Sequence, residues 1–346
     1  MRRFIVASMS LSALLLSSAP LLAQQATFDR LPDEILDVVA PSARVSGEPG
    51  NMRIADRSCR SWPRADVRSR IVNTVVQEWA FFGFSVEDMT RYSSVNARSG
   101  GDWRRRSRMS AAQAAQVAGS IGGYWAAAPE SGWILQRQND SWQARGIGTR
   151  WRNPWSAAFI SWVMCESGLG DAKRFERAIA HHNYIDQAIL AREQAESDTA
   201  YVAYDPAEFP IEPGDMLCRG SRPAYRSIAE RRAQLGVGAR THCDIVVKLD
   251  PAHDQIMVIG GNVGGSVRMK LLPAGKESGE YFEALPYNGR QIFAHLKLRA
   301  DPVAADALER SPTFQAINCS DSETPASASI ASLLLAPQLD CYSELP

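Results

Sequence analysis

The sequence predicts an α+β fold in which helices come first along the chain and an antiparallel sheet follows. Before Pro210, apolar residues recur at every third or fourth position in several segments, which indicates amphipathic helices. After Pro210, short β-rich runs are separated by turn signals. The segment from Asn153 to Met164 is apolar on every helical face, which is typical of a central helix covered on all sides. The rest of the prediction is arranged around that helix.

The N-terminus predicts an exported protein. The chain has 346 residues, enough for one large or two modest domains. Residues 1–23 place Arg2 and Arg3 before a serine-interrupted apolar run that ends at Ala23, which predicts a cleaved signal peptide and no stable membrane anchor. Subtracting these two arginines from 38 basic residues leaves 36 against 38 acidic residues, a net charge near −2. We therefore expect a periplasmic or extracellular protein that does not bind nucleic acid.

The domain organisation follows from composition. Residues 24–60 are proline-containing and aperiodic, so we expect a linker or an extended wrap, and residues 61–300 should form one domain. Residues 301–346 form an Ala-, Ser- and Pro-rich tail. Export allows the six cysteines to form disulfides. Cys319 and Cys341 lie together in the tail, so this pair is the one that sequence proximity favours most. The sequence has neither zinc-ligand spacing nor a nucleotide-binding fingerprint, so we expect no metal and no cofactor.

Several helices and one loop are expected before the strands. Periodic apolar residues predict a helix over 64–82, and an alanine-rich helix should follow over 110–125. Residues 130–150 lack a period and should form a long surface loop beside a cleft. A further helix is expected over 172–195. The arginine run within 103–108 either grips an anionic polymer or forms a solvated face, and we assign it no site.

The central helix carries the first candidate for chemistry. Asn153 is a suitable N-cap and Pro154 a suitable first helical residue, so Ser156 should lie in the first turn, and Gly168 should end the helix. Backbone N–H groups and the positive end of the helix dipole converge at this turn, where hydrolases often hold a nucleophile. The alternative is that Ser156 only caps its own helix.

The second candidate lies in the strands. If the turn after the first long strand is centred on Ala252, positions whose numbers sum to 504 face each other, and His242 stands opposite Asn262. An amide oxygen there would hold one imidazole nitrogen and leave the other as a base. The alternative is a chance pairing on a solvated sheet edge. We expect strands at 216–219, 242–249, 256–263, 266–272 and 291–298.

Four motifs in order resemble the CHAP-type branch of the papain-like amidases and peptidases, with their NlpC-like relatives. They are Pro154-Trp155-Ser156-Ala157-Ala158-Phe159, Pro213-Gly214-Asp215, His242 at the start of a strand, and Gly260-Gly261-Asn262. The resemblance covers about residues 150–270 and is also close to an uncharacterised bacterial family with serine at this helix start. It implies a papain-like fold, with a helical N-terminal part and the nucleophile helix packed on an antiparallel sheet. It also implies peptide or amide bonds of the bacterial cell wall as the substrate.

The resemblance assigns roles to these residues. Ser156 takes the nucleophile position that is usually cysteine, His242 the base and Asn262 the orienting amide. Trp155, from the tryptophan-rich stretch, should contact substrate, together with His181 and Asp244.

Two functions stay open. The chain is either an exported hydrolase of peptidoglycan peptides or amides with a Ser-His-Asn site, or an inactive module that binds peptidoglycan or an envelope protein. A serine ionises less readily than a cysteine, which favours the second function, whereas retention of both His242 and Asn262 favours the first. The resemblance also places Cys218 and Cys243 on adjacent strands, directed away from the site and close enough to form a disulfide.

Overall fold

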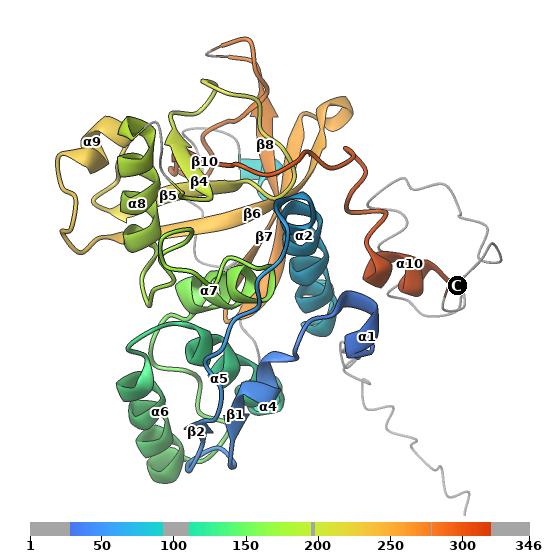
Figure 1. The fold of residues 1–346 in the computed structure, drawn as a ribbon, viewed down its shortest axis with the longest axis vertical. Coiled ribbons are helices and arrows are strands. Elements are labelled where there is room, and N and C mark those ends of the chain that lie inside the picture. Colours follow the sequence, from blue (N-terminus) through green and yellow to red (C-terminus); the bar gives the residue numbers. More distant parts are fainter. Residues whose placement is uncertain (1–27, 93–110, 195–197, 278, 320–346) are drawn as a thin grey trace, which may run out of the picture.

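The computed structural model describes residues 28–92, 111–194, 198–277 and 279–319. Its main sheet is almost entirely antiparallel and is packed against helices, which confirms the predicted α+β class (Figure 1). The strand order is β3-β8-β7-β6-β5-β10-β4, with β9 beside β8, and only β3 pairs in parallel among the described strands. These strands are β3 (Val86–Asp88), β4 (Tyr201–Tyr204), β5 (Met216–Arg222), β6 (Arg240–Asp250), β7 (Gln255–Val263), β8 (Ser266–Gly275), β9 (Glu283–Ala284) and β10 (Ile292–Leu298).

The helices lie mostly on one side of the sheet and in a helical region below it (Figure 1). The α-helices are α1 (Asp33–Leu36), α2 (Arg64–Phe81), α4 (Ala111–Gln116), α5 (Ala118–Ala127), α6 (Gly132–Arg145), α7 (Ser156–Glu166), α8 (His181–Glu193), α9 (Ile228–Arg232) and α10 (Pro312–Cys319). The short 3-10 helices are η1 (Pro41–Arg44), η2 (Thr90–Tyr92) and η3 (Pro251–His253). Every residue of α7 is buried, as expected for a central helix.

Both faces of the sheet are covered, and strand alternation divides the side chains between them. Ile245 and Ile259 belong to the large core shared with α2, α7 and α8. Val246 and Val258 belong to a smaller core on the opposite face, together with Tyr287. Side chains at positions i and i+2 of a strand lie on the same face, so alternate residues of each strand belong to the same core.

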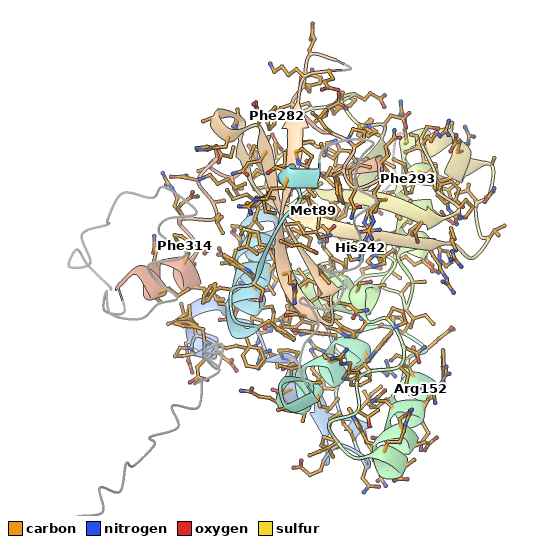
Figure 2. The ribbon with its side chains drawn as sticks, turned by 180° about the vertical axis from the view of Figure 1, so that it is seen from behind. Met89, Arg152, His242, Phe282, Phe293 and Phe314 are labelled. Carbon is orange, nitrogen blue, oxygen red and sulfur yellow. A yellow bond between two sulfur atoms is a disulfide. The ribbon has the colours of Figure 1, made fainter. Side chains whose placement is uncertain are left out.

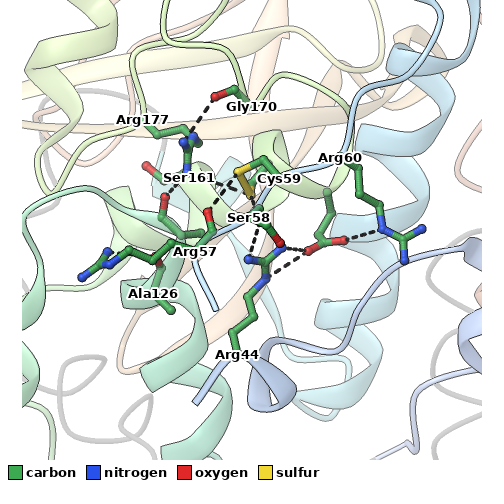
Figure 3. The surroundings of a disulfide bond; sticks show 12 residues. Arg44, Arg57, Ser58, Cys59, Arg60, Ala126, Ser161, Gly170 and Arg177 are labelled. Atoms are coloured by element: carbon green, nitrogen blue, oxygen red, sulfur yellow. Dashed lines mark hydrogen bonds and ion pairs between the residues drawn. A yellow bond between two sulfur atoms is a disulfide. The ribbon is translucent and has the colours of Figure 1, made fainter. Parts of the chain in front are cut away.

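The described part of the N-terminal segment, residues 28–60, packs against the helices. Its short strands β1 (Val45–Ser46) and β2 (Arg53–Ile54) form a hairpin, and a disulfide joins Cys59 to Cys165 near the end of α7. Beside it the buried Arg44 donates through Nε to the Glu166 carboxylate, 3.1 Å away. Figure 3 shows Arg44, Arg57 and Arg177 around this disulfide. The N-terminal segment is therefore fixed to the helix that carries Ser156.

The part of the C-terminal tail that is described joins the core. Helix α10 packs on α2, and both Leu308 and Phe314 are buried. Hydrophobic contacts therefore hold this part of the tail against the domain. The expected Cys319–Cys341 pair lies outside what the structure describes, since Cys341 and the side chain of Cys319 are not described. The arginine run within 103–108 also lies outside the described residues.

Three local expectations were wrong, each for an identifiable reason. Residues 130–150 contain helix α6, whose buried face includes the polar Gln138 and Asn139. The Asn139 amide bonds to the backbone of Met52, so tertiary contacts satisfy a face that breaks the apolar pattern. Residues 172–180 are not helical, because the buried Ser161 hydroxyl bonds both backbone groups of Ala178 and fixes the chain there. The N-cap of α7 is Trp155, two residues after the expected Asn153, so Pro154 lies before the helix and Ser156 is its first residue.

Candidate active site

Ser156 is the first residue of α7 and lies at the junction of helix and sheet. The first helical hydrogen bond runs from Phe159 N to Trp155 O, so the amide groups at Ser156 are free of intrahelical partners. Strand β7 comes very close to this helix: a Cβ on Gly261 would stand 2.6 Å from Cβ of Phe159. Glycine is therefore required at this contact. Ser156 itself is 8% exposed.

The hydrogen-bond partner of Ser156 is His181, from the first turn of α8. The Ser156 Oγ to His181 Nε2 distance is 2.6 Å. We expected His242 in this place and expected His181 to contact substrate. The structure thus brings a helix residue, 25 positions along the chain, to the serine. His182 is directed elsewhere and lines a separate pocket of about 630 Å³ with Lys173 and Asp198, as expected for adjacent helical positions.

The tautomer of His181 follows from its other nitrogen. The backbone N–H of Cys243 donates to His181 Nδ1 at 3.3 Å, and a backbone N–H has no acceptor capacity. Nδ1 is therefore unprotonated, and the Tyr184 hydroxyl also bonds to it. Burial, followed by the neighbouring His242, lowers the pKa of His181 well below its usual range, so the ring is neutral. Its single proton is on Nε2 and is donated to Ser156 Oγ.

The Cys243 N–H is available because β6 and β7 separate at this point. The pairs Val246↔Val258 and Ile245↔Ile259 follow the predicted sum of 504, and the described pairing ends there. Continuing that register would set Cys243 opposite Gly261, but the imidazole of His181 accepts the Cys243 N–H instead. The helix histidine is thus held by the sheet where the strands diverge.

The Cys218–Cys243 disulfide is present on the adjacent strands β5 and β6, as predicted. Its Cα atoms are 4.1 Å apart. Both cysteines belong to the core shared with α7, so the expectation that they are directed away from the site holds with respect to His242 but not with respect to the helix of Ser156. By alternation His242 and Asp244 then lie on the opposite face.

His242 and Asp244 form a second polar group next to His181. The two imidazole rings have centroids 5.2 Å apart. His242 Nε2 is 2.9 Å from Asp244 Oδ1, and Lys270 Nζ is 2.5 Å from Asp244 Oδ2. Asp244 therefore occupies the orienting position that we expected for Asn262. Figure 2 shows His242 on β6 in the view from behind.

The charges of this group are well defined. Burial lowers the pKa of His242 to about 4, although Asp244 opposes that shift. Burial alone would raise the pKa of Asp244, but the His242 and Lys270 partners outweigh it and hold that pKa well below its usual range. At neutral pH a neutral His242 thus donates its Nε2 proton to an ionised Asp244. Its Nδ1 has no hydrogen-bond partner in the described part of the chain and is free to accept a proton.

Gly260 makes room for this pair. A Cβ at Gly260 would stand 1.8 Å from Asp244 Oδ1 and 3.3 Å from His242 Nε2. The Gly-Gly-Asn motif therefore has a different role for each residue: Gly260 admits the Asp244 carboxylate, and Gly261 admits α7.

Asn262 lies at a neighbouring pocket. Its backbone is left-handed, with φ of 57°, and no hydrogen bond joins its side chain to His242 among the described residues. It lines a pocket of about 320 Å³ with Trp155, Trp151, Arg150, Gly264 and Gly265. Trp155 is mostly core, 2% exposed and stacked on Tyr124.

Sequence reasoning missed Lys270 and Tyr184. Lys270 is a buried cation in β8, where Arg268 and Lys270 alternate with apolar residues, a pattern typical of a solvent-facing strand side, so nothing in the sequence marked it as a site residue. Tyr184 follows His181 by three residues, a spacing that places both on one helix face.

No group of three residues able to hold a metal ion occurs among the described residues. None of the described helices has both the length and the hydropathy of a membrane span.

Comparison with known proteins identifies one family. A bacterial family described as "Uncharacterized protein conserved in bacteria (DUF2272)" matches residues 112–291, slightly more than half of the chain. No curated protein and no solved structure matches.

Proposed function

We propose that this chain, which belongs to the bacterial family DUF2272, is an exported hydrolase of amide or peptide bonds in the cell envelope. The observation that carries this proposal is the series of contacts from Ser156 through His181 to the oriented pair of His242 and Asp244. A neutral imidazole with one nitrogen held by a carboxylate and the other open is the arrangement that a general base requires.

The proposed reaction uses each group in a defined way. Because His181 donates to Ser156 Oγ, it cannot also take the hydroxyl proton of Ser156, so the reaction needs another acceptor for that proton. For this step the ring of His242, whose centroid lies 5.2 Å from that of His181, must come within hydrogen-bond reach of Ser156. As Oγ attacks the carbonyl carbon, His242 Nδ1 then takes the serine proton, and Asp244 stabilises the imidazolium that forms. The proton then goes to the leaving amine, and water hydrolyses the ester. The His181 Nε2–H favours the developing negative charge on Oγ, which helps a serine act where the resembled family uses cysteine.

The setting supports an envelope substrate. Two disulfides among the described cysteines indicate an oxidising environment. The signal-like residues 1–23 and the resemblance to cell-wall amidases support export and peptidoglycan as substrate.

The proposal is tested by incubating the mature protein with purified peptidoglycan and analysing released fragments by mass spectrometry. Ser156→Ala should abolish release, and His242→Ala should slow it by about 10²- to 10⁴-fold, the usual contribution of a general base. His253→Ala, on the exposed η3 turn, is the matched control and should leave the rate unchanged. Absence of fragments from wild type would contradict the hydrolase.

A second set of variants identifies the orienting residue. Asp244→Ala should slow release more than Asn262→Ala, because Asp244 bonds to His242 and the described structure has no such bond from Asn262. The reverse order would support the original Ser-His-Asn assignment. Ser156→Cys replaces the hydroxyl with the thiol of the resembled family and should retain or raise activity if the site is catalytic.

The direction of the His181–Ser156 bond favours a second candidate, a non-catalytic module that binds peptidoglycan or an envelope partner. In that bond the histidine is a donor and does not remove the serine proton. This candidate predicts that the protein sediments with peptidoglycan, releases nothing, and binds as well after Ser156→Cys as before.

A further inference from the structure

Arg219 on β5 differs from the other buried arginines of the described chain. Arg44, Arg68 and Arg231 each bind a carboxylate, from Glu166, Asp215 and Asp186 respectively. Arg219 is partly buried and has no hydrogen bond or ion pair with any described residue, and its Nε is shielded from solvent. The burial of Nε without a partner has a desolvation cost that no described group repays, and the rest of the guanidinium is left to bind a ligand.

The strand register places Arg219 beside the proposed base. Arg219 pairs directly with His242 across β5 and β6 and with Ile292 across β5 and β10. Directly paired residues of antiparallel strands share a face, and their Cα atoms are about 4.5 to 5.5 Å apart. The guanidinium therefore starts from the backbone position next to His242, on the face that carries Asp244.

Tyr287 supplies a second unused donor on this face. It is 1% exposed and belongs to the same buried cluster as Leu217 and Ile292, which flank Arg219. Its hydroxyl is shielded from solvent and has no partner among the described residues. Burial raises the pKa of Tyr287 to about 12, so the phenol keeps its proton. The positive charge of Arg219 is the second largest influence on this pKa and lowers it.

We propose that Arg219 and Tyr287 bind a free carboxylate of the substrate. A guanidinium fork and a protonated phenol both donate, and a planar carboxylate can accept from both. An extended peptide spans about 3.3 to 3.6 Å per residue, so a carboxylate held next to His242 lies within about two residues of the bond attacked. The inference rests on the proposed function and specifies its substrate: a peptide cleaved close to a free carboxylate, not in the middle of a long chain.

Binding is tested apart from catalysis, in full-length protein that carries Ser156→Ala. The probes are N-acetyl-alanyl-alanine and its C-terminal amide, which differ only in the carboxylate, and the measurement is isothermal titration calorimetry. The acid should bind at least about tenfold more tightly than the amide, the usual effect of a charge-assisted pair. Arg219→Gln should remove that difference and Tyr287→Phe should reduce it. Arg226→Gln, an exposed arginine after β5, is the control and should preserve it.

The outcomes separate the two proposals. Equal binding of acid and amide, an unchanged preference in Arg219→Gln, or no binding of either probe up to about 10 mM would each overturn the carboxylate site. A preference that depends on Arg219, in a protein that releases no peptidoglycan fragments, would keep this site and remove the hydrolase. If Arg219→Gln lowers the urea midpoint, Arg219→Lys keeps the charge without the fork and should still lose most of the preference.

Discussion

The two neutral histidines of the site should make the stability of the fold depend on pH. Burial lowers the pKa of His242 to about 4 and lowers that of His181 well below its usual range. In the unfolded chain both histidines would have a pKa of about 6.5. Between those values the unfolded chain binds more protons than the folded chain, so stability is greatest above about pH 6.5 and falls as the pH falls toward 4.

The size of the effect follows from the His242 shift. A difference of about 2.5 pKa units, at about 1.36 kcal/mol each, removes about 3 kcal/mol of stability once the pH has fallen below 4. Between pH 6 and pH 5 the contribution of His242 is about 1 kcal/mol, because the unfolded imidazole is mostly protonated and the folded one is not. Asp244 stays ionised in this range, since its pKa is held low.

The assay is urea unfolding of wild type and His242→Asn at about pH 7, 6 and 5, with the disulfides intact. The difference between the two proteins isolates His242, because His181 contributes to both. The free energy of unfolding of wild type should fall by about 1 kcal/mol more than that of the variant between pH 6 and pH 5. Parallel pH dependences would refute a buried neutral His242 and, with it, the proposed base.

Three other predictions concern the supports of the site. Gly260→Ala should lower the free energy of unfolding by about 1–3 kcal/mol in urea titrations and slow any hydrolysis, because its Cβ would displace Asp244 from His242. Replacing both Cys59 and Cys165 with serine should lower it by about 5 kcal/mol, since their bond closes a loop of 106 residues. The ¹⁵N shifts of His181 should show an unprotonated Nδ1 and a protonated Nε2 at neutral pH.

Each of these has a result that contradicts it. A Gly260→Ala protein as stable and as active as wild type would mean that the carboxylate does not sit above this glycine. An unchanged urea midpoint without the Cys59–Cys165 bond would show that packing alone holds the N-terminal segment. A protonated His181 Nδ1 would reverse the direction of its bond to Ser156 and make it the base in place of His242.

The sequence by itself determined the elements that local periodicity and turn chemistry encode. The apolar pattern predicted the helix over 64–82 and the buried helix of Ser156, and β-rich runs predicted the strands that hold His242 and Asn262. The register sum of 504 holds for the two pairs nearest the site, whereas the three pairs next to the turn sum to 505, because the register shifts between Val246 and Lys248. The family resemblance placed Cys218 next to Cys243, and strand alternation could not tell which face of the sheet would meet the helices.

Only the tertiary structure decided which polar groups meet. His181 reaches Ser156 because α8 lies over the point where β6 and β7 separate and its Nδ1 takes the N–H of Cys243. Lys270 joins Asp244 across β7 because Gly260 has no side chain there. Such contacts depend on the packing of segments far apart in the chain, whereas periodicity records only the neighbours within one element.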